Sequence, residues 1–133
     1  MVNESTPAAL VTGASYGIGR AIAVGLAHDG WDVVVTDLNP HDLEPVVADI
    51  QGLGRRAVAL ALDLRAPETF VGVVSHAVER CPGLSVLVNN AGLALGLEPA
   101  HRADLDDWET MVDTNIKGLL YCTRLLLPGM VER

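Results

Sequence analysis

Residues 8–19, AALVTGASYGIG, decide the fold of this 133-residue chain. A short apolar run, 8–12, leads into a glycine-rich turn that opens an amphipathic stretch, 18–28. Glycines in such a turn tolerate unusual φ angles, let a pyrophosphate approach the backbone, and allow the helix to pack closely on the strand. A plain tight turn would explain a glycine triplet by itself, but the place of this one between a strand and a helix favours dinucleotide binding.

The rest of the chain continues the same alternation. Apolar runs at 32–37, 57–62 and 85–89 lack strict alternation, which is typical of strands buried on both faces. Helical stretches at 42–53 and 67–81 separate them, and glycines follow both. We therefore predict one α/β domain over residues 1–133, with a three-layer, doubly wound, Rossmann-like parallel sheet that is incomplete and has strand order 3-2-1-4. A fourth helix is expected from near Asp104 to Pro128 and Gly129.

Composition narrows the partners and the compartment. Nine basic against 17 acidic side chains give a net charge of -8, opposite in sign to the surface of nucleic-acid binders, so no nucleic-acid partner is expected. No apolar run approaches the roughly 18 residues of a membrane span. The amino-terminal residues lack the basic segment of a signal peptide. We therefore expect a cytoplasmic protein without a membrane segment.

Cysteines and histidines are expected to have structural roles only. Cys81 and Cys122 form no Cys-x-x-Cys pair and are expected to be reduced packing residues. The four histidines lack metal-ligand spacing, and Pro99 interrupts the one tempting pair, Glu98 and His101. The sequence therefore predicts no metal site.

Each expected strand ends in a polar or glycine-containing signal: Thr12-Gly13, Asp37, Asp63 and Asn89-Asn90. In an open parallel sheet these ends line one crevice, where ligands bind. Polar residues that simply terminate strands are the alternative, and for Asp63 or Asn90 alone it is the preferred one.

Asp37 stands 18 residues after Gly19, at the end of the second expected strand. A carboxylate there can accept hydrogen bonds from both hydroxyls of the adenosine ribose, and it would repel a 2′-phosphate. No Arg or Lys follows in Leu38-Asn39-Pro40 to neutralise such a phosphate. NAD is therefore expected in preference to NADP, although a turn aspartate before Asn39-Pro40 is a reasonable alternative for this residue by itself.

Taken together, TGASYGIG at 12–19, Asp63, NNAG at 89–92 and Thr114-Asn115 resemble the motifs of the short-chain dehydrogenase/reductase family. The resemblance covers essentially the whole chain and implies hydride transfer between an alcohol or hydroxy acid and a carbonyl. It also implies that the glycines hold the pyrophosphate, Asp63 and Leu64 the adenine, and 89–92 the central strand and the nicotinamide ribose. The candidate cofactor-binding residues are Gly13, Ser15, Tyr16, Gly17, Ile18, Gly19, Asp37, Leu38, Asp63, Leu64, Asn89, Asn90, Ala91 and Gly92.

Asn115 is the one candidate catalytic residue. It shares an expected helix face with Val112, Ile116 and Leu119, so its amide should be largely buried and must find partners. In the family the matching Asn belongs to an Asn-Ser-Tyr-Lys tetrad and holds a water that relays protons to the Lys. A helix kink filled by a water, eased by Gly118, is the structural alternative and is part of that role.

The chain departs from the family in its other catalytic residues. The Ser and the Tyr-x-x-x-Lys are expected beyond residue 133, since neither tyrosine of the chain has Lys four residues later. Residues 1–88 resemble the ketoacyl-carrier-protein reductase branch, and 89–133 the serine and 3-hydroxy acid dehydrogenase branch, whose members commonly use NADP. A fragment, a truncated gene product or a recombination of two members would each account for this.

Two functions follow from the sequence. The first is the NAD-binding portion of a short-chain oxidoreductase, whose small-molecule substrate the sequence does not identify. The second is a noncatalytic nucleotide-binding or assembly module. A homo-oligomer is expected because the fourth strand lies at the sheet edge and the last helix carries a leucine-rich surface. That surface consists of Leu119, Leu120, Leu126 and Leu127.

Overall fold

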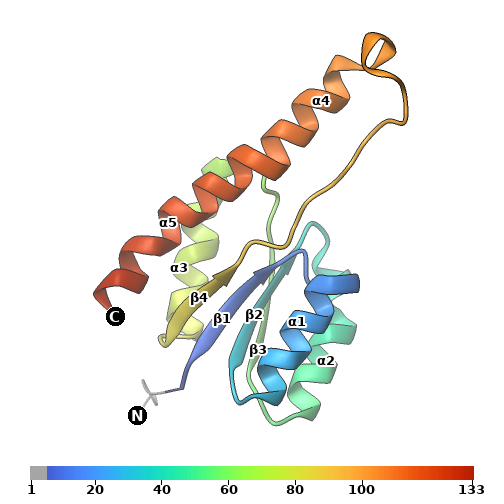
Figure 1. Ribbon diagram of the computed structural model, residues 1–133. Helices are drawn as coiled ribbons and strands as arrows, with labels where there is room; N and C mark the ends of the chain where they lie inside the picture. The colour runs from blue at the N-terminus through green and yellow to red at the C-terminus, as the bar shows by residue number, and fades with distance from the viewer. Residues whose placement is uncertain (1–5) are drawn as a thin grey trace.

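The computed structural model describes residues 6–133 and contains one parallel sheet in the order β3-β2-β1-β4 (Figure 1). The strands are β1 (Ala8–Thr12), β2 (Asp32–Asp37), β3 (Ala57–Ala61) and β4 (Leu84–Val88). The predicted order and parallel direction are confirmed. The bounds of β1 and β2 agree with the sequence prediction, β3 is one residue shorter, and β4 lies one residue earlier.

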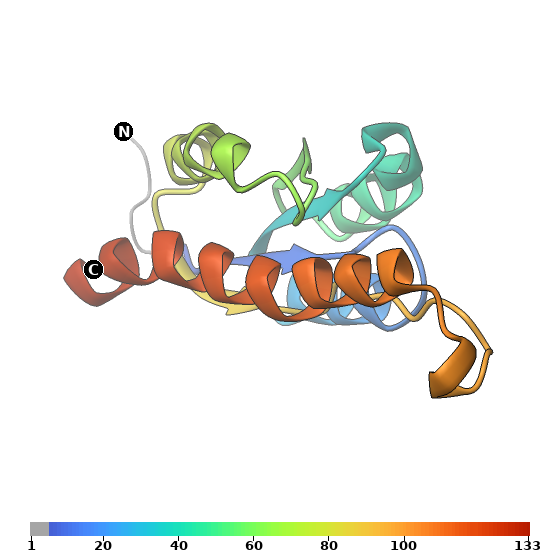
Figure 2. The same cartoon turned by 90° about the horizontal axis from the view of Figure 1, so that it is seen from above.

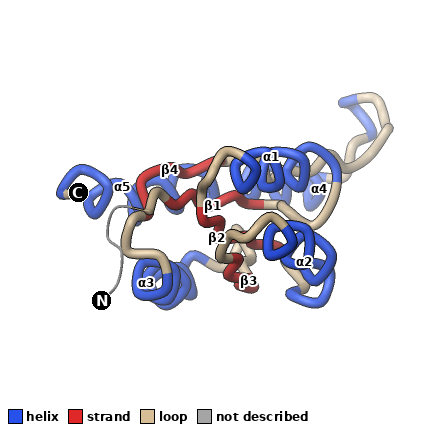
Figure 3. Tube along the Cα trace, turned by 90° about the horizontal axis from the view of Figure 1, so that it is seen from below, coloured by secondary structure: helices blue, strands red, loops and turns tan. Residues whose placement is uncertain are grey.

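Helices cover both faces of the sheet. They are α1 (Gly17–His28), α2 (Glu44–Gly52), α3 (Phe70–Arg80), α4 (Leu105–Val112) and α5 (Leu119–Glu132), with a π-helical segment, η4 (Asp113–Gly118), between the last two. Short 3-10 turns lie at η1 (Pro40–Leu43), η2 (Pro67–Thr69) and η3 (Ala100–Arg102). Figure 3 shows α1 and α2 on one side of the sheet and α3 on the other. The predicted three layers are therefore present.

The core is divided by the sheet into two clusters. Successive side chains of a strand point to opposite faces, so Val33 and Val35 of β2 pack with α1 and α2, whereas Val34 packs toward α3 and α5. All three valines are fully buried. A strand buried on both faces needs apolar residues at every position, which is why these runs lack alternation.

The last helix differs from the prediction at its end. α4, η4 and α5 form one continuous rod (Figures 1 and 2), and the rod continues through Pro128 to Glu132. Pro128 removes one helical hydrogen bond. Arg133 holds the end in place, since its Nε and Nη2 donate to the carbonyl of Leu84 at 2.9 and 2.5 Å. A tertiary contact thus overrides the local stop signal.

The buried face of this rod also differs from the prediction. The residues turned toward the core lie four apart, and they are Thr114, Gly118, Cys122 and Leu126. Leu126, expected on an open surface, is therefore in the core. The expected apolar face is instead exposed, with Val112 at 42%, Ile116 at 55% and Leu120 at 57%. Thr114, Gly118 and Cys122 have small side chains because the rod packs too closely against the loop after β3 for large ones. Gly118, for example, lies directly against Leu64 of that loop.

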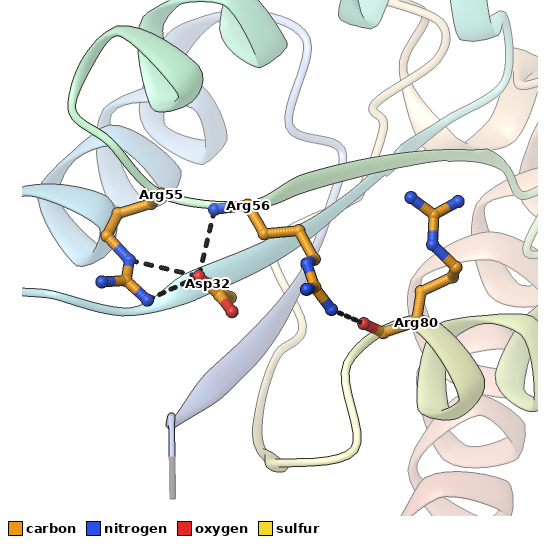
Figure 4. A network of polar contacts seen from close by, with 4 residues as sticks. All are labelled: Asp32, Arg55, Arg56 and Arg80. Atoms are coloured by element: carbon orange, nitrogen blue, oxygen red, sulfur yellow. Dashed lines mark hydrogen bonds and ion pairs between the residues drawn. The ribbon is translucent and has the colours of Figure 1, made fainter. Parts of the chain in front are cut away.

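The amino-terminal edge of the sheet is closed by charged side chains (Figure 4). Oδ1 of Asp32 accepts from Nε and Nη2 of Arg55 at 3.1 and 2.8 Å and from the backbone N of Arg56 at 3.0 Å. Nη1 of Arg56 donates to the carbonyl of Arg80, at the end of α3, at 2.5 Å. We call Asp32, Arg55, Arg56 and the Arg80 carbonyl the arginine clamp. The clamp joins the starts of β2 and β3 to α3 and leaves the opposite edge open.

Both cysteines are buried and free, as predicted. Burial raises the pKa of the Cys81 thiol, the Asp32 carboxylate raises it further, and Arg56 and Arg80 act in the opposite direction. Burial alone raises the pKa of Cys122 to about 11. Among residues 6–133, none of the helices combines the length and hydrophobicity that a bilayer crossing requires. Residues 1–5, which were considered for a signal peptide, lie outside the described residues.

Candidate functional site

A cleft of about 330 Å³ opens at the carboxyl ends of the strands. Four segments that are distant in the sequence contribute to it: the glycine-rich turn after β1, the end of β2, the loop after β3, and the loop after β4 with the facing turn of the last rod. The lining residues are Thr12, Gly13, Tyr16, Thr36, Asp37, Leu38, Leu62, Asp63, Leu64, Arg65, Ala91, Gly92, Leu93, Thr110 and Thr114. Three of the four predicted strand ends, Thr12-Gly13, Asp37 and Asp63, therefore line one cleft. Asn89-Asn90 does not line it, and the residues that follow, Ala91 and Gly92, do so instead.

The glycine-rich turn has the backbone that only glycine adopts readily. Gly13 and Gly17 have φ of +65° and +62°. A Cβ on Gly13 would lie 2.9 Å from the Cα of Ala91, so the turn after β1 and the loop after β4 touch through it. A Cβ on Gly17 would meet nothing within 4 Å. The backbone at Gly17 is thus open to approach by a ligand.

Gly19 and Asn90 hold the turn closed. A Cβ on Gly19 would overlap both the Gly13 carbonyl oxygen and Nδ2 of Asn90. That Nδ2 donates to the carbonyls of Thr12 and Gly13, at 3.0 Å each. The third glycine is therefore required by close packing of α1 against the turn, and Asn90 acts as a support for the turn.

The amino end of α1 has the properties of an anion site. Tyr16 is its N-cap residue and makes no side-chain hydrogen bond to the helix, and the first turn contains no acidic residue. The first N–H groups of a helix lack partners within it and carry a partial positive charge. A phosphate group placed over Gly17 would meet these donors. The residues present therefore fit the pyrophosphate of a dinucleotide.

Asp37 lines the cleft at the end of β2, and its carboxylate is held by backbone and hydroxyl donors. Oδ2 accepts from Oγ of Ser15 and, at 3.2 Å, from the backbone N of Ser15. Oδ1 accepts from the backbone N of Leu38 at 2.9 Å. Within residues 6–133 it takes part in no ion pair. The negative charge is therefore available to a ligand that enters the cleft.

Asp63 and Leu64 form the next wall, in the loop after β3. Oδ1 of Asp63 accepts from the backbone N of Arg65 at 2.9 Å, which fixes the carboxylate in this loop. Leu64 is 7% exposed and packs against the last rod: a Cβ on Gly118 would lie 2.6 Å from Cβ and 2.8 Å from O of Leu64. The position of this wall therefore depends on the rod.

Asn115 is half-buried in η4, and its amide is used twice. Oδ1 accepts from the backbone N of Leu93 at 2.9 Å, and Nδ2 donates to the carbonyl of Leu93 at 2.7 Å. The predicted irregularity at this residue is present as the π-helical segment, a common feature of functional sites. The side-chain amide of Asn115 thus has hydrogen-bond partners, as expected, and both are backbone groups of Leu93. The supposed shared face with Val112 and Ile116 is wrong, because those side chains point outward.

The other predicted residues lie in less direct positions. Ser15 is buried behind Asp37, and Ile18 is 75% exposed on α1. Nδ2 of Asn89 donates to Oγ1 of Thr123, at 3.1 Å, so this side chain supports α5. Gly17, Gly19, Asn90 and Asn115 shape the cleft from outside its lining. Eight predicted residues line it directly, and these are Gly13, Tyr16, Asp37, Leu38, Asp63, Leu64, Ala91 and Gly92.

Thr36 is the residue that sequence reasoning missed, and Thr12 and Thr114, which it named only within motifs, have surroundings that it did not predict. Oγ1 of Thr12 accepts from the backbone N of Asn90 and of Ala91, at 3.1 and 3.0 Å, and so joins β1 to the loop after β4. Thr36 and Thr114 line the cleft, and their buried hydroxyls have no hydrogen-bond partner among the described residues. Thr36 could have been found as the polar residue next to Asp37 at the end of β2. Within the described part of the chain, no group of three or more His, Cys, Asp or Glu could hold a metal ion.

Comparison with known proteins adds a family and several relatives. The model of the short chain dehydrogenase family matches residues 7–133. The NADP-dependent 3-hydroxy acid dehydrogenase of Salmonella typhi is 45% identical over 124 residues, which are 93% of this chain and 49% of that protein. The chain spans about half the length of the curated relatives it matches.

Two solved structures are similar to this chain in both fold and sequence. Serine dehydrogenase from Escherichia coli superposes with a TM-score of 0.84 and 42% identity, over 95% of this chain and 57% of that one. A 3-oxoacyl-[acyl-carrier protein] reductase from Brucella melitensis in complex with NAD gives a TM-score of 0.90 and 32% identity, over 96% and 50%. Both branches suggested by the sequence are thus among the matches, and each match covers nearly all of this chain.

Proposed function

The chain belongs to the short-chain dehydrogenase family, whose members bind a nicotinamide dinucleotide, and from this premise we propose that residues 1–133 are the dinucleotide-binding domain of an oxidoreductase. The reaction is hydride transfer between the cofactor and an alcohol or a hydroxy acid. The observation that carries the proposal is the cleft itself, which brings the open glycine turn, Asp37, Asp63 and Gly92 to one opening. The cofactor supplies the hydride acceptor, and the protein supplies position and charge.

The roles that the family resemblance implies can be matched to the residues of the cleft. The amino end of α1, over Gly17, would hold the pyrophosphate. Asp37 would accept from the adenosine ribose, and the loop of Asp63 and Leu64 would form the adenine wall. Ala91 and Gly92 would lie along the nicotinamide side, and Asn115 would position that loop through Leu93. These segments lie along the open edge of the sheet, where dinucleotides bind in folds of this class.

Asp37 favours NAD over NADP. A 2′-phosphate beside an uncompensated carboxylate is repelled, and no basic side chain forms an ion pair with Asp37 in the described part of the chain. The relative from Salmonella typhi is named as NADP-dependent, whereas the reductase from Brucella melitensis was solved with NAD. The name of the relative from Salmonella typhi thus indicates NADP, whereas the charge of Asp37 indicates NAD. Our proposal of NAD rests on the charge of Asp37.

Calorimetric titration with NAD and NADP tests this choice. The wild-type chain is expected to bind NAD more tightly, and Asp37→Ala to narrow the difference. A charged hydrogen bond contributes about 1.5–3 kcal/mol, which corresponds to roughly tenfold or more in affinity. Equal or tighter binding of NADP by the wild type would overturn the preference and agree with the NADP-dependent relatives.

Catalysis by residues 1–133 alone is not expected. Hydride transfer from an alcohol needs a base for the hydroxyl proton and a donor for the developing oxyanion. In this family Ser and Tyr-x-x-x-Lys provide them, and the sequence contains no Tyr-x-x-x-Lys. Its only lysine, Lys117, forms an ion pair with Asp113 at 3.2 Å. Binding without NAD reduction is therefore the expected result. Turnover that Asn115→Ala abolishes would contradict it.

An assembly module is the second candidate, and the exposed face of α4 and α5 favours it. Val112, Ile116, Leu120 and Leu127 are 42–57% exposed there, and β4 forms one edge of the sheet. Large exposed apolar patches mark interaction surfaces. We therefore propose a homo-oligomer. We also propose that the protein is located in the cytoplasm, where free cysteines such as the two buried here stay reduced. A stable monomer at micromolar concentration in light scattering would refute the oligomer.

A further inference from the structure

Ser15 is a predicted cofactor residue that lies outside the lining of the cleft and contacts another predicted site residue, Asp37. It is 6% exposed and does not line the cleft. Both its hydroxyl and its backbone N–H donate to Oδ2 of Asp37. The neighbouring residue fixes the same register, because the backbone N of Ala14 donates to the carbonyl of Thr36 at 3.0 Å. The glycine-rich turn therefore holds the end of β2 at two successive residues.

These contacts nearly fill the carboxylate. An ionised carboxylate has about four acceptor positions. Ser15 occupies two of them on Oδ2, and the N–H of Leu38 occupies one on Oδ1. One position remains, on Oδ1, and Asp37 lines the cleft where a ligand hydroxyl would meet it. The side chain is thus restricted to one rotamer, and a single acceptor position is left for a ligand.

We infer that Ser15 is a positioning residue for ribose specificity, which acts through Asp37 rather than by touching the cofactor. The inference rests on the proposed function in one respect, namely that Asp37 accepts from a ribose hydroxyl. Because the donors on Asp37 are neutral, they orient the carboxylate without cancelling its charge. The contact with Ser15 therefore leaves one acceptor position for a ribose hydroxyl and also leaves the negative charge that repels a 2′-phosphate. An arginine in the place of Ser15 would orient the group but remove the discrimination.

Ser15→Ala tests the inference in the full chain, with NAD, NADP and ADP-ribose as ligands in calorimetry. Freeing one immobilised side chain costs about three- to tenfold in affinity, so NAD and ADP-ribose should bind about fivefold more weakly. NADP should bind as before or more tightly, because the carboxylate can then turn away from the phosphate. Nicotinamide mononucleotide, which lacks the adenosine ribose, should show no change. Ser75→Ala, an exposed serine on α3, is the matched control and should leave all affinities unchanged.

A double-mutant cycle separates a role through Asp37 from a direct contact. In the Asp37→Ala background, Ser15→Ala should have no further effect on NAD. Additive losses would mean that Ser15 binds the ligand itself and would overturn the inference. A crystal structure of Ser15→Ala gives a reading without ligand. With only the backbone N–H groups of residues 15 and 38 left as donors, the Asp37 carboxylate should shift from its wild-type position, and an unmoved carboxylate would also overturn the inference. Failure of the proposed function looks different, since then the wild type and Asp37→Ala would bind NAD and NADP alike.

Discussion

Gly118 offers the sharpest test of how the last rod positions the cleft. It has φ of -59° and ψ of -44°, so alanine could adopt its backbone without strain. The obstacle is space, because the new Cβ would lie 2.6 Å from Cβ of Leu64, 2.8 Å from its carbonyl oxygen and 3.2 Å from the carbonyl oxygen of Asp113. Two of these three atoms belong to the backbone, which cannot rotate away. The rod and the loop of Leu64 must therefore separate.

The magnitude is a difference between two opposing effects. Forcing a methyl group into a packed contact costs about 1–3 kcal/mol. Replacing glycine by alanine inside a helix gains about 1 kcal/mol. Gly118→Ala should therefore lower the free energy of unfolding by about 1 kcal/mol, which for a chain of this size lowers Tm by roughly 4 °C. Because Leu64 lines the cleft, the affinity for ADP-ribose should fall as well.

Gly25→Ala is the matched control. Gly25 lies within α1, is exposed, and a Cβ there would meet nothing within 4 Å. The same substitution should therefore raise the free energy of unfolding by about 0.5–1 kcal/mol. Urea denaturation followed by circular dichroism measures both variants with one extrapolation. If Gly118→Ala proved as stable as Gly25→Ala, close packing at Leu64 would be the wrong explanation for this glycine.

Three further predictions follow from single side chains. Asn115→Ala should lower the free energy of unfolding by about 1–3 kcal/mol, because it strands the backbone N–H and carbonyl of Leu93, and unchanged urea denaturation would contradict this. Thr114→Val should raise it by about 1 kcal/mol, since a methyl group replaces a buried hydroxyl that has no partner among residues 6–133, and a loss of stability would show that the hydroxyl is bonded. Stability should fall as the pH rises from about 9 to about 11, because the unfolded Cys122 thiol ionises near its ordinary pKa of 9.0 while burial keeps the folded thiol protonated up to its pKa of about 11. Denaturation across this range should show a smaller loss for Cys122→Ala, and equal slopes would rule out this thiol as the cause.

Local patterns were sufficient for the strands and for the open edge of the sheet. The valine run of β2 and the glycines after each helix are signals that act within a few residues, and β2 begins and ends where they predicted. The polar residues at the ends of the first three strands line one cleft because parallel strands must end at the same edge, whereas Asn89 and Asn90 lie outside its lining. The topology therefore placed Asp37 and Asp63 before any side-chain geometry was known.

The sequence-based prediction was wrong where contacts between residues that are distant in the sequence determine the structure. Pro128 and Gly129 are valid stop signals, but Arg133 bonds to Leu84 and the helix continues. Apolar residues lie all around the circumference of the rod, so the helical periodicity does not identify one buried face. We predicted that Ile116 faces the core, but it is exposed, and the small residues Thr114 and Gly118 pack against the core instead. The hydrogen bond between the side chains of Ser15 and Asp37 joins the glycine-rich turn to the end of β2, and no spacing rule describes it.

The sheet order also sets a sequence of assembly. β1 lies at the centre, with its early partner β2 on one side and β4, synthesised much later, on the other. On a ribosome, the first three strands and their helices can pair while β4 is still inside the exit tunnel. The glycine-rich turn is then bonded to the end of β2 but lacks its other support, since the amide that bonds the Thr12 and Gly13 carbonyls belongs to Asn90. The nucleotide cradle is thus completed last, and a nascent chain would gain affinity for its ligand in one late step.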